Sequence, residues 1–303
     1  MASESRFRTV VLPAFAALAA VVAVAAGAIW IIDATPDDDD TVANSPAPVA
    51  GPQLVHLGDS FASGAGTTPL VEDSPVMCQR AQANFGERIA ATRKLTVTDV
   101  SCAGATTEDF RVAQYDGVGP QLDSLSTSAK YVTVMIGGND GALFTTLVGE
   151  CTRLAQDDPT GSPCTSALGR KPFRAIATHT QPDVTATLAE IRRRAPSAQV
   201  LIVGYPRLMP AARTCRPAVG IADGDLDYVN RIEAALNAAV RAAAKATGVT
   251  YVDLERPFAG HDACAARGTR WIEPQYGADT AVVMHPNERG QEAIAAAVAA
   301  QMR

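Results

Sequence analysis

Short apolar runs alternate with longer helical patterns along most of this chain, and this alternation restricts its fold more than any other feature. Five runs are mostly β-branched and bounded by Gly, Asp or Pro, which is typical of buried strands. They are Gln53–Leu57, Leu95–Val100, Tyr131–Ile136, Val200–Val203 and Thr250–Leu254. The pattern predicts an α/β protein with a doubly wound parallel sheet.

Helical patterns accompany the later runs. Apolar residues recur every three or four positions from Leu226 to Val240, and Gly248 follows where a helix would end. Further helices are expected over Ile176–Arg194 and Glu288–Gln301. The sequence therefore predicts one domain over residues 52–303.

A run of 23 uncharged residues, Val10–Ile32, precedes this domain. It is long enough to span a bilayer, and Arg6 and Arg8 on its N-terminal side favour a cytoplasmic N-terminus. We therefore expect a cytoplasmic tail at 1–9, a transmembrane anchor at 10–32 and an acidic, Pro-rich flexible linker at 33–51.

A cleaved signal peptide is the alternative for this run. Its hydrophobic region would normally span only about 7–15 residues. A cleavage site near Ala23–Ala25 is conceivable, but the apolar stretch continues to Ile32, so we favour the anchor. Both alternatives place the domain outside the cytoplasm, as a membrane-attached or a secreted protein.

Six cysteines are present in the exported region, and an even number outside the cytoplasm indicates three disulfides. They are Cys78, Cys102, Cys151, Cys164, Cys215 and Cys264. Fifteen pairings are possible, and we predict pairing in chain order because it suits the order of the elements. The absence of any CxxC pair argues against a zinc site.

Charge and motif content exclude two classes of partner. Lys and Arg number 26 against 32 Asp and Glu, and no segment concentrates enough basic residues to follow a phosphate backbone, so nucleic acid is not an expected partner. No Lys follows a Gly, which excludes a P-loop for nucleotides.

Glycine and small polar residues follow the first three predicted strands. The segments are Gly58–Gly64, Ser101–Ala105 and Gly137–Asp140. Ligands of doubly wound sheets bind at the carboxyl ends of the strands, and such turns can hold hydrogen-bond donors close to a reacting atom. Each segment alone is an ordinary turn, but together they predict a site at one sheet edge.

Four histidines are candidates for a base. His56 lies within the first predicted strand, His179 within a helix, and His261 in a loop near a cysteine, which favours structural roles for all three. His285 instead precedes Pro286-Asn287, which can begin a helix. A loop held by a rigid element is the usual position of a catalytic side chain.

With these motifs, residues 52–303 resemble the SGNH hydrolase superfamily, also called GDSL esterases and lipases, and within it exported actinobacterial lipase/esterases with three disulfides. The blocks that carry the resemblance are Gly58-Asp59-Ser60, Gly104, Gly137-Gly138-Asn139-Asp140, and His285-Pro286-Asn287 with Gly290. Their order and spacing are specific to the family, although no single block is.

The resemblance implies a role for each matching residue. Ser60 would be the nucleophile and His285 its base, while the N–H groups of Ser60 and Gly104 and the side-chain amide of Asn139 would form an oxyanion hole. It also implies a flavodoxin-like three-layer sandwich with a five-stranded parallel sheet.

The sequence departs from the family pattern at one position. Most members carry Asp three residues before the catalytic His, where this chain has Val282. We predict that the main-chain carbonyl of Val282 orients His285, as in members that lack the carboxylate, with Asp279 as the alternative.

The implied activity is that of a serine esterase or lipase acting through an acyl-serine intermediate, with no metal or organic cofactor. The expected partners are a small-molecule or lipid ester and, through the N-terminal helix, a membrane, with the chain a monomer. An imidazole with an unshifted pKa would make the rate rise through pH ~6–7.

Two other functions remain open. One is a cell-envelope acyltransferase or carbohydrate O-acyl esterase, in which a sugar takes part in the same acyl-enzyme chemistry. The other is an inactive, surface-tethered binding module on a hydrolase scaffold, against which the presence of Ser60, Gly104, Asn139 and His285 argues.

Overall fold

A five-stranded parallel sheet organises the protein. The computed structural model describes residues 53–212 and 214–303, so the predicted segments 1–9, 10–32 and 33–51 lie outside the described residues. The sheet has the order β2-β1-β3-β4-β5. Its strands are β1 (Leu54–Gly58), β2 (Val97–Asp99), β3 (Tyr131–Met135), β4 (Gln199–Val203) and β5 (Thr250–Val252). The five predicted strands are confirmed, and this strand order is that of flavodoxin-like folds.

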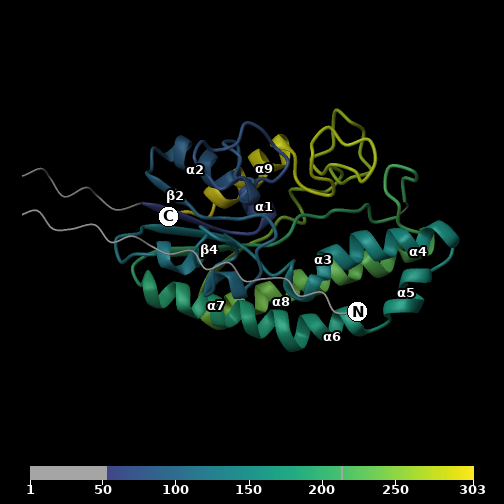
Figure 1. The fold of residues 1–303 in the computed structure, drawn as a ribbon, viewed down its shortest axis with the longest axis horizontal. Helices are drawn as coiled ribbons and strands as arrows, with labels where there is room; N and C mark the ends of the chain where they lie inside the picture. The colour runs from purple at the N-terminus through teal and green to yellow at the C-terminus, as the bar shows by residue number, and fades with distance from the viewer. Residues whose placement is uncertain (1–52, 213) are drawn as a thin grey trace, which may run out of the picture. The chain divides into compact units, whose positions relative to one another are not determined.

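Helices cover both faces of the sheet (Figure 1). On one face α2 (Phe85–Arg93) packs beside α9 (Glu288–Ala299), and on the other α7 (Gln181–Arg194) packs beside α8 (Leu226–Thr247). The helix α8 ends at Gly248, whose φ of 67° gives the left-handed cap expected from the sequence. The structure is therefore a three-layer α/β sandwich.

Shorter helical pieces follow the strands. The α-helical ones are α1 (Ser60–Ser63), α3 (Leu143–Thr145), α4 (Cys151–Asp157), α5 (Pro163–Leu168) and α6 (Lys171–Ala175). Turns of 3₁₀ helix occur at Val76–Cys78, Glu108–Phe110, Gln121–Ser124, Asp140–Ala142 and Asp223–Asp225, and π-helical turns at Thr146–Glu150 and Ile176–Thr180. The predicted helix Ile176–Arg194 thus begins with a π-helical turn and continues as α7. Within the described residues, no helix is both long and apolar enough to span a membrane.

His56 illustrates how tightly the first strand is packed. Its Nδ1 lies 2.8 Å from Thr133 Oγ1 and its Nε2 lies 3.0 Å from the Ala62 carbonyl oxygen. A Cβ at Gly86 in α2 would stand 2.3 Å from the imidazole, so only glycine permits this approach. His56 is therefore a packing residue of the sheet, as the sequence predicts.

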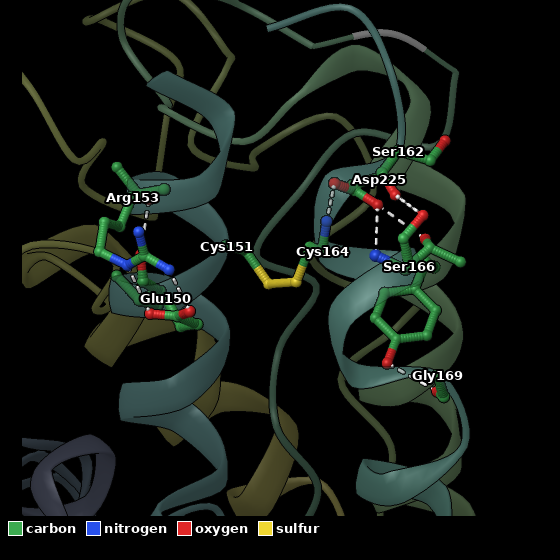
Figure 2. The surroundings of a disulfide bond; sticks show 12 residues. Glu150, Cys151, Arg153, Ser162, Cys164, Ser166, Gly169 and Asp225 are labelled. Carbon is green, nitrogen blue, oxygen red and sulfur yellow. Dashed lines mark hydrogen bonds and ion pairs between the residues drawn. A yellow bond between two sulfur atoms is a disulfide. The ribbon is translucent and has the colours of Figure 1, made fainter. Parts of the chain in front are cut away.

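Three disulfides join the cysteines in chain order, as predicted: Cys78–Cys102, Cys151–Cys164 and Cys215–Cys264. Figure 2 shows the second of these linking α4 to α5. Beside it the Asp225 carboxylate accepts hydrogen bonds from the backbone N–H groups of Cys164 and Thr165, both at 2.8 Å. This carboxylate also connects the start of α5 to the start of α8.

Candidate active site

The turn after β1 fixes the position of Ser60. Gly58 has a φ of 135°, and a Cβ there would stand 2.3 Å from the Met135 carbonyl oxygen of β3, so only glycine allows this close strand end. Asp59 then caps α1 by accepting a hydrogen bond from the Phe61 N–H at 2.9 Å. Ser60 is the first residue of this short helix, and its side chain is held at the sheet edge.

His285 contacts Ser60 directly. Its Nε2 lies 2.7 Å from Ser60 Oγ, although 225 positions separate the two residues in the sequence. Both residues are buried. The pair is arranged as in a nucleophile and a general base.

The backbone carbonyl of Val283 orients the imidazole: it lies 2.8 Å from His285 Nδ1. The prediction of the Val282 carbonyl is therefore wrong by one residue. Met284 adopts a left-handed conformation with a φ of 57°, and this turn directs the Val283 carbonyl toward the ring. The Val282 carbonyl instead accepts a hydrogen bond from Thr280 Oγ1 at 3.2 Å.

Asp279, the alternative orienting group, faces away from this arrangement. Its carboxylate pairs with Arg267 and, at 2.7 Å, with Arg270. Among the described residues its carboxylate has no hydrogen bond with His285. The orienting group in the structure is therefore an uncharged carbonyl.

Aromatic side chains surround the imidazole. The ring of Phe61 lies 4.4 Å from that of His285 between centroids, and the ring of Phe144 lies edge-on at 5.3 Å. Burial lowers the pKa of His285 to about 4, and the hydrogen bond with Val283 opposes this shift. The imidazole is therefore neutral at pH 7, and the unshifted pKa expected from the sequence does not apply.

The turns after β2 and β3 meet the turn that carries Ser60. The Cys102 N–H donates to the Gly58 carbonyl at 3.0 Å, and Gly104 follows with a φ of 80°. The Asn139 side-chain amide donates to the Ala105 carbonyl at 3.0 Å, which leaves its second hydrogen free. Gly104 and Asn139 are thus brought together at the edge predicted for them. Within residues 53–212 and 214–303, the N–H groups of Ser60 and Gly104 donate to no acceptor.

Tyr205 is a residue of this site that none of the sequence motifs predicted. Its hydroxyl donates to Asp59 Oδ2 and accepts a hydrogen bond from the Gly138 N–H at 2.7 Å. Tyr205 therefore joins the turn of Ser60 to the turn of Asn139. Burial raises the pKa of Asp59 to about 7. Tyr205 follows β4 closely, so applying the strand-end rule to the fourth strand would have found it.

Glu273 was also missed, and it holds the segment that carries His285. The Glu273 carboxylate is 2% exposed and accepts hydrogen bonds from Arg270 Nη2 at 2.9 Å, the Asp279 N–H at 2.7 Å and Asn287 Nδ2 at 2.8 Å. Its backbone N–H donates to the His285 carbonyl at 2.9 Å. No pattern in the sequence distinguishes this glutamate from a surface one.

The other two histidines lie apart from the site. His179 is exposed, and His261 stacks on Trp271 with ring centroids 3.7 Å apart. In the part of the chain that the structure describes, no group of three or more His, Cys, Asp or Glu side chains is arranged to hold a metal ion.

Comparison with known proteins agrees with this geometry. Residues 56–293 match the model of the GDSL-like lipase/acylhydrolase family. Lipase 2 of Streptomyces coelicolor is 41% identical over 91% of this chain and 93% of its own length.

Two solved structures share the fold at 25% identity. Phospholipase A1 from Streptomyces albidoflavus superposes with a TM-score of 0.70 over 84% of this chain and 100% of its own. The extracellular lipase from Streptomyces rimosus superposes with a TM-score of 0.68 over 82% of this chain and 99% of its own. The chain therefore belongs to the GDSL-like lipase/acylhydrolase family, a family of carboxylic ester hydrolases.

Proposed function

We propose that the protein hydrolyses carboxylic esters with Ser60 as the nucleophile and His285 as the general base. The observation that carries this proposal is the chain of contacts from the Val283 carbonyl through the imidazole to Ser60 Oγ, at 2.8 and 2.7 Å. A carbonyl only accepts hydrogen bonds, so His285 Nδ1 carries the proton and Nε2 presents its lone pair to the serine hydroxyl.

The reaction then follows in two stages. Ser60 Oγ attacks the ester carbonyl and passes its proton to His285 Nε2, which gives that proton to the departing alcohol. In the second stage His285 takes a proton from water, which attacks the acyl-Ser60, and His285 then returns this proton to Ser60 Oγ as the bond to the acyl group breaks and the acid leaves. The N–H groups of Ser60 and Gly104 and the Asn139 amide stabilise the oxyanion in both stages.

The Val283 carbonyl replaces the carboxylate of a Ser-His-Asp triad. It fixes the tautomer and the orientation of the ring, but it bears no full charge to stabilise the imidazolium. A Ser-His dyad is therefore the proposed catalytic unit. Lipase 2 and phospholipase A1 among its relatives support acyl glycerides or phospholipids as the esters to test first.

The test is labelling with a fluorophosphonate probe together with ester hydrolysis. We expect the wild type to label and to release acid, and Ser60→Ala to lose both by at least ~10⁴-fold while its circular dichroism spectrum is unchanged. Hydrolysis by Ser60→Ala at more than a few per cent of the wild-type rate would overturn the proposal. A parallel assay with a sugar as acyl acceptor separates hydrolysis from acyl transfer.

We further propose that the domain works outside the cytoplasm, held by an anchor at residues 10–32 and a linker at 33–51. The three disulfides support an oxidising compartment, and the uncharged run supports the anchor. Full-length protein should remain in membranes after carbonate extraction and be released from intact cells by external protease. Soluble protein that begins near Ala26 would instead indicate a cleaved signal peptide.

A further inference from the structure

A small apolar cavity adjoins the candidate active site. Its volume is about 60 Å³. Gly138 and Met284 line it, and in the sequence they directly precede Asn139 and His285. Phe144 also lines it, and the Phe144 ring lies edge-on to the imidazole of His285. The cavity is thus separated by the Phe144 ring from the imidazole that contacts Ser60.

The rest of the cavity wall is almost entirely hydrocarbon. It is formed by aliphatic side chains, among them Leu143, Leu147, Val148, Val229, Ile232 and Leu236. Such a wall makes no hydrogen bonds to a polar ligand, and it favours burial of an alkyl chain. The cavity is thus suited to the acyl part of an ester.

Glu233 is the exception in this wall. This α8 residue lines the apolar cavity and also a second cavity of about 220 Å³, which is bordered mainly by polar side chains. Tyr205 is the other residue that lines both. Glu233 Oε2 accepts a hydrogen bond from the Leu208 N–H at 3.0 Å, which holds the carboxyl group between the two cavities. We refer to this carboxyl group as the partition.

Burial favours the protonated, uncharged form of Glu233. Burial raises the pKa of Glu233 to about 8; the Leu208 N–H and Arg207 act against this shift, and Glu255 and Asp262 add to it. The other titratable groups around the second cavity are Tyr205, Arg241, Tyr251 and Asp253. A protonated Glu233 allows an apolar chain to lie against it, whereas the carboxylate would oppose this.

We propose, building on the proposed function, that this cavity binds the acyl chain during acylation of Ser60, and that Glu233 limits it to short and medium, neutral chains. At about 10–15 Å³ for each water-sized atom, the cavity holds roughly four to six such atoms beyond the carbonyl. Each methylene that enters should raise kcat/KM roughly fourfold until the space is filled. Counting the carbonyl carbon, the optimum is therefore expected between about five and seven carbons.

The first experiment measures kcat/KM for a series of p-nitrophenyl esters from acetyl to palmitoyl. Glu233→Ala removes the partition and joins the two cavities, so the optimum should move to longer chains by several carbons. Asn230→Ala, a truncation of an uncharged α8 residue that lines only the second cavity, should leave the wild-type profile in place. An unchanged optimum in Glu233→Ala would overturn the proposal.

A second variant fills the cavity from a partly exposed position. Val229→Phe should lower kcat/KM for the hexanoyl ester at least tenfold and change that for the acetyl ester less than threefold. The acetyl ester thus reports whether the variant is folded and active. Equal losses on both esters would contradict acyl binding in this cavity.

The pH dependence supplies an independent measurement. KM for the hexanoyl ester should rise above pH ~8, where Glu233 ionises, and Glu233→Gln should abolish this rise. The acetyl ester should show little change. If no ester showed Ser60-dependent hydrolysis, the proposed function itself would be rejected. If hydrolysis depended on Ser60 but the chain-length profile did not respond to changes at Glu233 and Val229, only this inference would be rejected.

Discussion

The two halves of the proposed catalytic pair are held in different ways. Ser60 follows a fully buried strand by two residues, and the parallel pairing of β1 with β3 fixes its position. His285 lies near the end of residues 253–287, a segment between β5 and α9 in which the described chain forms neither an α-helix nor a strand. Side-chain contacts hold it instead.

The contacts around His285 form one connected set. The Glu273 carboxylate binds Arg270 and Asn287, and the Glu273 backbone bonds both Met284 and His285 at 2.9 Å. Such a set depends on several buried polar groups at once, so losing one leaves others without partners. We therefore expect changes on the Ser60 side to affect chemistry alone, and changes on the His285 side to affect chemistry and stability together.

Asn139→Ala tests the Ser60 side and should have the largest effect after Ser60→Ala. Removing one oxyanion donor typically lowers turnover by ~10²–10³. The side chain is partly exposed and its amide makes one hydrogen bond, to Ala105, so the melting temperature should change little. Steady-state kinetics and thermal melting measure both quantities. A near-normal kcat would remove Asn139 from the proposed oxyanion hole.

Glu273→Gln tests the His285 side. In this variant the buried Arg270 loses the Glu273 carboxylate and keeps only that of Asp279. This loss should lower the free energy of unfolding by about 1–3 kcal/mol. Small displacement of His285 should lower kcat by up to ~10²-fold, because catalysis depends on its position to within about 1 Å.

Controls separate this positioning effect from a general loss of structure. Glu292→Gln makes the same chemical change on the exposed side of α9 and should alter neither quantity. Glu273→Asp should recover part of the activity by retaining the charge. If Glu273→Gln lowered stability and left kcat unchanged, Glu273 would be structural only.

This difference also explains what the sequence could predict. The five strands and the meeting of Gly58, Cys102 and Asn139 at one edge follow from apolar runs and from the geometry of parallel sheets. The choice of His285 followed from the presence of only four histidines. These features depend on local sequence or on one general rule of topology.

Other features depend on contacts that no local pattern records. The left-handed conformation of Met284 moves the orienting carbonyl from Val282 to Val283, and methionine carries no signal for such a conformation. Glu273 owes its role to hydrogen bonds with Arg270, Asp279 and Asn287 in the same irregular segment. Glu233 owes its role to the loop that holds Leu208, 25 positions earlier in the chain. The sequence predicted the scaffold better than the contacts that support His285.

Asp279→Asn should have a much smaller effect than either change above. Its carboxylate is partly exposed and pairs with Arg267 and Arg270, so its loss removes little stability. Because the Val283 carbonyl orients the imidazole, kcat/KM should fall less than threefold. A fall of three orders of magnitude with folding preserved would make Asp279 the orienting group and contradict the observed arrangement.

The pH profile should show the smallest change of all, and it distinguishes the two sides by their titrating groups. The imidazole must be neutral to accept the serine proton, so activity increases with pH through the pKa of His285. With that pKa lowered to about 4 by burial, kcat/KM should rise only about 1.1-fold from pH 5 to 7, whereas an unshifted value would give roughly 25-fold. Ionisation of Asp59, whose pKa burial raises to about 7, would produce a second change in kcat/KM near pH 7. The variant Asp59→Asn would remove this second change and leave the rise through the pKa of His285 where it is. If kcat/KM instead rose once, near pH 6.5, and did so in Asp59→Asn as well, His285 would be more hydrated during turnover than the structure indicates.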